Sequence, residues 1–229
     1  MRPTLYLLVL IHFFSAAAIA QTLHCSAGPS YPHLFNWGGR SGHFQSQYSS
    51  KVGYSFNLAL ENLPFNDFPM RLSLDFGRQQ NQIYIEDGGL GGGHRSNADI
   101  DKYLLGLSAC PIHLKIPHVL HLFLGGYFNM VVHDKSMGTK LSWLRGTPDS
   151  IVLFKPHTFP INRTGNFGLA SILSCPIPLK SGYALVPTYT CHLGLTPEYA
   201  NNIGTSSPKL IRHQFSLGIS KQLKPPQKA

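Results

Sequence analysis

Apolar residues recur at every second position over long stretches of this chain. Between Val52 and Glu61 the residues Val, Tyr, Phe, Leu and Leu alternate with Gly, Ser, Asn, Ala and Glu, and the same period runs through Met70–Gly77, Leu120–Val132 and Gln214–Ser220. Successive side chains of a β-strand point to opposite faces, so each segment has one apolar and one polar face. No helical period of 3.6 residues appears, and we expect an all-β fold.

Eight segments read as strands, and most are longer than the five or six residues usual in globular sheets. A strand tilted across a bilayer needs about 9 to 11 residues plus its ends, which fits these lengths. The predicted strands are residues 33–40, 51–62, 69–80, 100–113, 119–132, 166–177, 182–195 and 210–223.

The connections between these strands alternate in length. The odd-numbered ones, residues 41–50, 81–99, 133–165 and 196–209, are long and polar, Gly-rich or Pro-rich, whereas the even-numbered ones, near residues 62–68, 114–118 and 178–182, are short. Long loops on one side and tight turns on the other are typical of outer-membrane barrels, and a soluble sandwich has no reason to sort its loops in this way.

The first 20 residues have the pattern of an export signal. Met1-Arg2 supplies a positive start, Leu5–Phe14 an apolar run, and Ala18-Ile19-Ala20 a signal-peptidase site, so the mature chain is predicted to begin at Gln21. The alternatives are a membrane helix, for which the run is too short, and a lipoprotein anchor at Cys25, which His24 before it disfavours. No later stretch has 18 consecutive apolar residues.

Charge and cysteine content restrict the function classes. Removal of residues 1–20 takes away one Arg, and the remaining 18 basic and 10 acidic residues give a formal charge of +8. An exported chain without a Lys/Arg block meets lipid phosphates rather than nucleic acid. The four cysteines have no CxxC spacing and are too few for a disulfide scaffold.

The second half carries a pattern of short elements in a characteristic order. Its elements are Tyr103–Gly106 with Cys110–Leu114, Leu122–Tyr127, Asn166–Ala170 with Pro178–Gly182, Thr188-Tyr189 with Leu193–Thr196, and His213–Ile219. Their order and spacing resemble the PorT-like family of outer-membrane β-barrel proteins, from about Asp101 to Leu223. The resemblance implies the fold and a place in the outer membrane. Pro187 inside a strand is unusual there, because Pro donates no ladder hydrogen bond, and we expect a bulge.

Four candidate sites are weighed against plainer interpretations. His113, His118 and His121 are the closest histidines, but no Cys or carboxylate that could complete a metal site lies near them in the sequence. Ser216 beside His213 is better explained as a polar side chain that fills the lumen than as a nucleophile. Gly88–Gly93 lacks the Lys-Ser/Thr of a phosphate loop and is expected to be a flexible outer loop; Asn162-Arg163-Thr164 matches a glycosylation sequon. We therefore predict no catalytic, cofactor-binding or metal-binding residue and no cofactor.

Glu61, Arg71 and Asp75 share the polar parity of two predicted strands. A basic residue facing lipid at the bilayer midplane costs roughly 2–4 kcal/mol, so we expect all three to point inward and fill the interior. Eight strands leave a lumen just wide enough for side chains, and no diffusion channel is expected.

The prediction is an eight-stranded antiparallel up-and-down transmembrane β-barrel, residues 21–223, followed by a short basic tail, residues 224–229. We expect a Gram-negative outer-membrane protein, not an enzyme, with a structural or surface-interaction role. Its expected partners are outer-membrane lipids, lipopolysaccharide and the barrel-insertion machinery during assembly, with any protein or ligand contact at the outer loops, above all residues 133–165. The alternatives are a secreted lipocalin-like ligand-binding barrel, although Asn36-Trp37-Gly38 reverses the G-x-W signature, and an outer-membrane lipid-modifying enzyme.

Overall fold

The computed structural model is all-β and describes residues 22–35, 44–65, 68–89, 92–116, 119–144, 150–154, 165–197 and 209–223. The predicted signal sequence, the sequon, His118 and the basic tail lie outside these residues. The strands are β1 (Thr22–Phe35), β2 (Phe44–Phe65), β3 (Phe68–Gly89), β4 (Gly92–Ile116), β5 (Leu120–Leu144), β6 (Ser150–Phe154), β7 (Asn166–Ser174), β8 (Ile177–Pro178), β9 (Tyr183–Gly194) and β10 (Lys209–Gln222). A short 3-10 helix, Lys180–Gly182, precedes β9. No described helix is long and apolar enough to cross a membrane.

Eight of the described strands form a closed antiparallel ring. Their order is β1–β2–β3–β4–β5–β7–β9–β10, and β10 pairs with β1 from Lys209 to Gln222 to complete the ring. Each strand pairs with the next ring strand along the chain, which is the up-and-down connection predicted from the sequence. The ring of eight is therefore confirmed, while β6 and β8 are short additions to β5 and β9.

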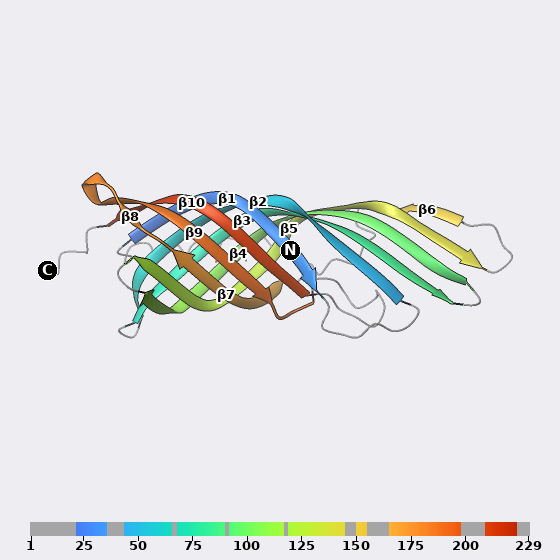
Figure 1. The fold of residues 1–229 in the computed structure, drawn as a ribbon, viewed down its shortest axis with the longest axis horizontal. Helices are drawn as coiled ribbons and strands as arrows, with labels where there is room; N and C mark the ends of the chain where they lie inside the picture. Colours follow the sequence, from blue (N-terminus) through green and yellow to red (C-terminus); the bar gives the residue numbers. More distant parts are fainter. Residues whose placement is uncertain are drawn as a thin grey trace.

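Four neighbouring strands continue far beyond the ring. β2 to β5 have 22 to 25 residues, whereas β1, β7, β9 and β10 have 9 to 14. At about 3.3 Å per residue, β4 is roughly 80 Å long. We call the projecting part, residues 44–51, 80–89, 92–101 and 133–144 together with β6, the extension; Figure 1 shows it leaving one end of the ring. The other end, which carries the β2–β3, β4–β5 and β7–β9 connections, is the turn end.

The extension corrects three predicted loops. Residues 44–50, 81–89 with 92–99, and 133–144 with 150–154 are strands, not loops. The predicted flexible glycine loop is instead a hairpin tip, because Gly88 pairs with Gly93 and Gly89 with Gly92. Most positions on both faces of these strands are polar, and the apolar inward residues Ile83, Ala98 and Ile100, near the ring, give too short an alternation to reveal the strands.

The first predicted strand, residues 33–40, is also wrong in position. β1 begins at Thr22 and ends at Phe35, and it pairs with β2 from Thr22 to Ser30. Its outward residues include Cys25, Ala27 and Pro29 instead of large apolar side chains. The alternation of apolar and polar residues is therefore weak in this strand.

Pro187 does not produce the expected bulge. The β9–β10 pairing runs through Pro187 opposite Leu217 without a register shift. On the other side of β9 the Cys175 N–H donates to the Pro187 carbonyl oxygen at 3.1 Å, but Pro187 has no N–H to return the bond. β7 accordingly ends at Ser174, and pairing with β9 resumes only at Ile177 in β8.

Candidate functional site

The inner wall of the ring is largely polar, although Cys110, Phe123, Tyr127, Ala170 and Ile172 form one buried apolar cluster in it. Buried Ser, Thr, Asn, Gln, His and charged residues alternate along the strands with the outward positions, as the sequence predicts. The buried polar set includes His24, Ser26, Ser55, Arg71, Ser73, Asp75, Gln79, Asn81, Lys102, Ser108, Asn129, Thr188, Thr190, His192, Arg212 and Gln214, none of them more than 8% exposed.

Arg71 and Glu61 form an ion pair near the turn end of the lumen. The Arg71 side chain is 1% exposed and that of Glu61 is 15% exposed. Arg71 Nε also donates to Ser73 Oγ at 3.3 Å, and its guanidinium lies 5.3 Å from the centre of the Phe123 ring. The inward direction predicted for Glu61, Arg71 and Asp75 is confirmed.

Two further polar contacts lie in the wall. Asn57 Nδ2 donates to Asp75 Oδ1 at 2.7 Å, and Arg212 Nη2 lies 2.7 Å from His192 Nδ1. Arg212 is 2% exposed and Asp75 is 4% exposed, so both charges are removed from bulk water. Buried charges in a folded protein need partners of this kind.

Many other polar atoms of the inner wall have no protein partner. Both ring nitrogens of His24, both amide atoms of Gln79 and of Asn81, and Nε of Arg212 are buried without a hydrogen bond to another residue. Buried polar groups in proteins are bonded to protein atoms or to ordered water. These particular atoms therefore need ordered water as hydrogen-bond partners in the folded protein.

A cavity of about 300 Å³ opens at the turn end of the ring. Glu61, Lys115, Ser174, Ser220 and the histidines 113 and 121 are among its lining residues, together with residues of the β7–β9 connection. The rings of these two histidines lie 5.1 Å apart. We call this cavity the vestibule.

The opposite end of the lumen is closed by apolar side chains. These residues come from β1, β3, β4, β5 and β10, are 1% to 8% exposed, and pack together with Tyr48 of β2 against them. Three pairs are opposite each other in the sheet, Leu34 with Leu210, Ile83 with Ala98, and Leu104 with Val131. The apolar cap, as we call it, consists of Leu34, Ile83, Ala98, Ile100, Leu104, Val131 and Leu210.

The outer face of the ring is apolar and exposed. Between Arg78 toward the extension and Lys221 at the turn end, the outward positions of the described ring strands contain no Asp, Glu, Lys or Arg. Large side chains here are 37% to 57% exposed: Tyr54, Phe56, Phe76, Phe128, Phe167, Leu169, Phe215, Leu217 and Ile219. Apolar patches of this extent are rare on soluble monomers and indicate a contact with lipid or protein.

Aromatic and charged side chains meet where the apolar outer face ends. Toward the extension, Arg78 donates two hydrogen bonds to Asp101, at 2.9 and 2.6 Å, and lies 5.9 Å from the centre of the Tyr103 ring. At the turn end, Lys221 Nζ lies 5.3 Å from the centre of the Tyr183 ring. Amphipathic rings and snorkelling cations of this kind suit an interface between apolar and aqueous surroundings.

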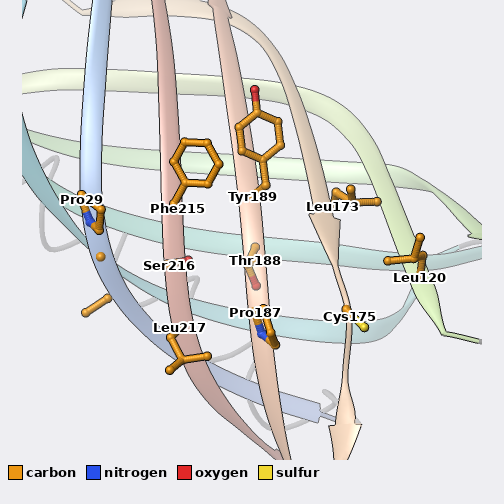
Figure 2. A pocket seen from close by; sticks show the side chains of 12 residues that line it. Pro29, Leu120, Leu173, Cys175, Pro187, Thr188, Tyr189, Phe215, Ser216 and Leu217 are labelled. Carbon is orange, nitrogen blue, oxygen red and sulfur yellow. The ribbon is translucent and has the colours of Figure 1, made fainter.

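A shallow groove of about 510 Å³ crosses the outer face over β1, β10, β9 and β7. Figure 2 shows Phe215 and Tyr189 side by side on neighbouring strands, and their ring centres are 4.9 Å apart. The lining is almost entirely apolar, with Leu120, Leu173 and Leu217 among its residues. The groove is part of the same apolar outer face, and no Asp, Glu, Lys, Arg or His is among its lining residues.

The extension carries polar networks on its surface. The Tyr84 hydroxyl donates to Glu86 at 2.5 Å, Arg95 bonds the same carboxylate at 3.2 Å, and Lys51 pairs with Asp99 at 3.0 Å. The Tyr84 hydroxyl, followed by Arg95, lowers the pKa of Glu86 below its ordinary value. Beyond Ile83 and Ala98, which are buried in an apolar cluster, these strands present polar and charged side chains to water.

The remaining candidate sites of the sequence do not converge. Among the described residues no group of three or more His, Cys, Asp or Glu side chains could hold a metal ion. His213 faces outward and lies 2.7 Å from the Tyr189 hydroxyl, whereas Ser216 has the inward parity of β10. A Ser–His pair is therefore not formed at this position. The four cysteines are free.

Sequence reasoning missed the apolar cap, the vestibule and the pairing of Arg212 with His192. The inward parity of Arg212 and His192 is readable from their strands, but their neighbourhood depends on the register of β9 against β10. The cap combines residues from five strands with no local signature.

Comparison with known proteins gives likenesses to solved structures only. No family model matches the chain, and no curated protein matches it. Neisserial surface protein A aligns at 15% identity over 88% of this chain and 97% of its own, with a TM-score of 0.37. The outer membrane protein OprG from Pseudomonas aeruginosa aligns at 10% over 89% and 97%, with a TM-score of 0.42, and AlkL, solved in DMPC lipid bilayers, at 12% over 90% and 93%, with 0.37. These likenesses assign no function to this chain.

Proposed function

We propose that this chain is a small β-barrel protein of a Gram-negative outer membrane, in which the ring spans the bilayer and the extension projects from the cell. Its role is structural or one of surface interaction rather than enzymatic. Long connections outside and short turns inside are the usual orientation of such barrels, and this orientation makes the vestibule periplasmic.

The observation that carries the proposal is the separation of charge between the two faces of the ring. Arg71, Asp75 and Arg212 are buried in the lumen, while the outward positions between Arg78 and Lys221 carry no acidic or basic residue. A soluble lipocalin-like barrel needs the reverse, an apolar cavity under a polar exterior.

The height of the apolar outer face agrees with a bilayer. On β10 it extends from residue 213 to residue 221, which is about 26 Å of strand at roughly 3.3 Å per residue and about 20 Å along the ring axis at a tilt of about 40°. The lipid-facing band of outer-membrane barrels is about 25 Å tall once the aromatic girdles at its borders are included.

The extension is the part that we assign to interaction outside the cell. Its strands add roughly 30 Å beyond the ring, since residues 80–89 of β3 alone rise by about 3.3 Å each. Edge residues 44–51 of β2 pair only with β3 among the described residues. A polar, projecting sheet of this kind offers a large contact area without exposing an apolar patch.

Membrane fractionation combined with heat modifiability tests the barrel. Detergent-extracted protein is run on SDS gels with and without boiling, after inner and outer membranes have been separated. A mobility shift confined to the outer-membrane fraction supports the proposal. Soluble periplasmic protein without a shift would refute it.

A shortened hairpin tests the extension. Replacing residues 85–96 by Asn-Gly preserves the Tyr84–Asn97 register and supplies a two-residue hairpin turn. We expect this variant to keep its heat-induced shift and to lose adhesion of expressing cells to host-cell monolayers or extracellular-matrix coatings to which the unmodified protein confers binding. Undiminished adhesion by the shortened protein would remove the assignment.

A further inference from the structure

The groove on the outer face forms where β1 contributes almost no side chain. Ala27 lies opposite Leu217 of β10 in the sheet, and Gly28 follows it, so these two β1 residues supply a single methyl group to the lining. Figure 2 shows Phe215 and Leu217 on the neighbouring strand, and they are 52% and 57% exposed. We propose that the groove holds one acyl chain of an anionic phospholipid whose phosphate lies at Lys221 and at Lys180 of the 3-10 helix. This inference rests on the proposed barrel and names a lipid that the barrel binds.

The outer face stays apolar from the groove to the turn end. Next to the groove, Ile219 of β10 lies opposite Leu185 of β9, and Ile177 of β8 pairs with Leu185 on its other side. Ile219 and Ile177 are 54% and 45% exposed. A hydrocarbon chain that ends in the groove can therefore rest on apolar side chains over its whole length up to Lys221.

The backbone beside the groove is irregular, but it has few N–H groups to leave unpaired. β7 ends at Ser174, and the Cys175 N–H donates to the Pro187 carbonyl oxygen. Pro176, Pro178 and Pro187 have no N–H. Because an unpaired N–H in hydrocarbon is costly, this proline-rich interruption of the ladder is compatible with a lipid chain that lies over it.

The spacing between the groove and Lys221 fits one leaflet of a bilayer. From Leu217 in the groove to Lys221 at the border, β10 rises by about 13 Å, which is about 10 Å along the ring axis at a tilt of about 40°. Half of a lipid-facing band about 25 Å tall is about 12 Å. A phosphate at Lys221 therefore places the acyl chain of the same lipid at the level of the groove.

The turn end beside the groove favours a negative charge. Lys221 pairs with Tyr183 across the sheet, its Nζ lies 5.3 Å from the centre of the Tyr183 ring, and Lys180 precedes Tyr183 in the 3-10 helix. Both lysines are exposed. Among the described residues of the turn end the only carboxylate is that of Glu61, which is bound to Arg71 in the lumen. The two lysines therefore favour a headgroup with a net negative charge, such as that of phosphatidylglycerol.

At the opposite border of the apolar outer face, a cation beside an aromatic ring is balanced by a carboxylate. Arg78 lies near the Tyr103 ring and donates two hydrogen bonds to Asp101. No carboxylate of a described residue takes this place beside Lys221 and Tyr183. In the proposed orientation the turn end is periplasmic, and the periplasmic leaflet of an outer membrane consists of phospholipid rather than lipopolysaccharide. Charge and orientation thus select the same class of lipid.

A larger side chain in the groove tests the site of the acyl chain. Ala27→Phe fills the hollow on β1 without a change of charge. The matched control is Gly126→Phe, on the outward face of β5 and outside the groove. A Cβ at Gly126 would meet only the Gly168 carbonyl oxygen, at 3.6 Å, so the control ring has room.

Removal of two lysines tests the site of the headgroup. Lys180→Gln with Lys221→Gln removes two positive charges from the turn-end border of the groove. The matched control is Lys115→Gln with Lys135→Gln, which removes the same charge from the vestibule and from the extension.

Native mass spectrometry of the purified full chain in detergent measures lipid binding, with phosphatidylglycerol, phosphatidylethanolamine and lipopolysaccharide as probes. We expect one tightly retained phosphatidylglycerol molecule, with a dissociation constant raised about fivefold for each of Lys180 and Lys221 removed and unchanged in both controls. Ala27→Phe should weaken both phospholipids alike, because they share the acyl chain. Heat modifiability of every variant verifies that it is folded.

Each other outcome refutes a defined part of the argument. Folded protein that retains the two phospholipids equally, or that keeps phosphatidylglycerol after the lysine substitutions, would overturn the lipid site and leave the barrel intact. Preferential retention of lipopolysaccharide would overturn the choice of lipid, and a dimer that only Ala27→Phe dissociates would assign the groove to a second copy. Unmodified protein without a heat-induced shift would refute the barrel, and the lipid site with it.

Discussion

Removal of the cation from the Arg71–Glu61 pair should destabilise the folded ring strongly. Arg71→Met leaves the Glu61 carboxylate beside the lumen without its partner, and breaking a buried ion pair in this way costs about 3–5 kcal/mol. Because the Glu61 side chain is 15% exposed and lines the vestibule, water compensates it partly, which favours the lower limit. Loss of the guanidinium over Phe123 adds up to about 2 kcal/mol for a desolvated contact. We expect about 4 kcal/mol in all.

Substitution of the other partner, Glu61, tests how the cost depends on the burial of the charge that is left unpaired. Glu61→Met leaves the nearly fully buried Arg71 cation unpaired, so it should cost at least as much as Arg71→Met. The double variant leaves neither charge behind and should cost only about 1–2 kcal/mol, since an apolar replacement of a buried pair is often close to neutral. The matched control is Arg78→Met, because the Arg78 and Asp101 side chains are 33% and 26% exposed and solvent screens such pairs, so this change should cost much less than Arg71→Met.

Urea titration in lipid vesicles measures these free energies, with the heat-sensitive gel band as the folded fraction. A double variant that costs the sum of the single variants would show that the two side chains do not interact. An Arg78→Met cost equal to that of Arg71→Met would show that burial does not determine the effect.

Three further substitutions test parts of the structure away from the Arg71–Glu61 ion pair. Leu217→Arg places a cation midway on the outward face of β10 and should lower the free energy of unfolding by about 2–4 kcal/mol in vesicle titrations. Lys221→Leu, at the border of the apolar outer face, should lower it by less than about 1 kcal/mol. Equal costs would refute the proposal that the apolar outer face contacts lipid. Gly28→Ala would bring a Cβ within 1.9 Å of the Phe215 carbonyl oxygen, so closure of the ring between β1 and β10 should be impaired and the gel shift should be lost. A normal shift would show that the backbone of β10 moves enough to admit the methyl group. The lowered pKa of Glu86 means that its contribution to stability is present above the ordinary value of 4.5 and is lost as pH falls through the lower folded pKa. Protection from hydrogen exchange in the extension should therefore decrease as pH falls below 4.5, and Glu86→Gln should abolish that change.

The ring could be predicted because its two faces differ. Wherever Leu, Phe or Tyr alternate with Ser, Asn or a charged residue, as from Val52 to Glu61, the outward and inward sets were assigned correctly. The inward placement of Arg71 and Asp75 followed from the same parity and the cost of a charge in lipid.

The extension and the cap could not be predicted, for opposite reasons. Strands such as residues 44–51 are polar on both faces, and weak patterning of this kind leaves register and length unspecified. The cap is apolar, but its residues are inward and separated along the chain, so each looks like an interruption of a polar face. Ile83 and Ala98 become neighbours only through the β3–β4 register.

The unbroken passage of β3 and β4 from the ring into the extension gives the protein a mechanical property. A pull on the hairpin tip, where Gly89 pairs with Gly92, acts along both strands. Ladder hydrogen bonds run across the strands, so this load is shared as shear by many bonds to β2 and β5 at once instead of peeling them apart one by one. In the proposed outer-membrane protein, a load on this tip would be resisted by the whole wall of the ring.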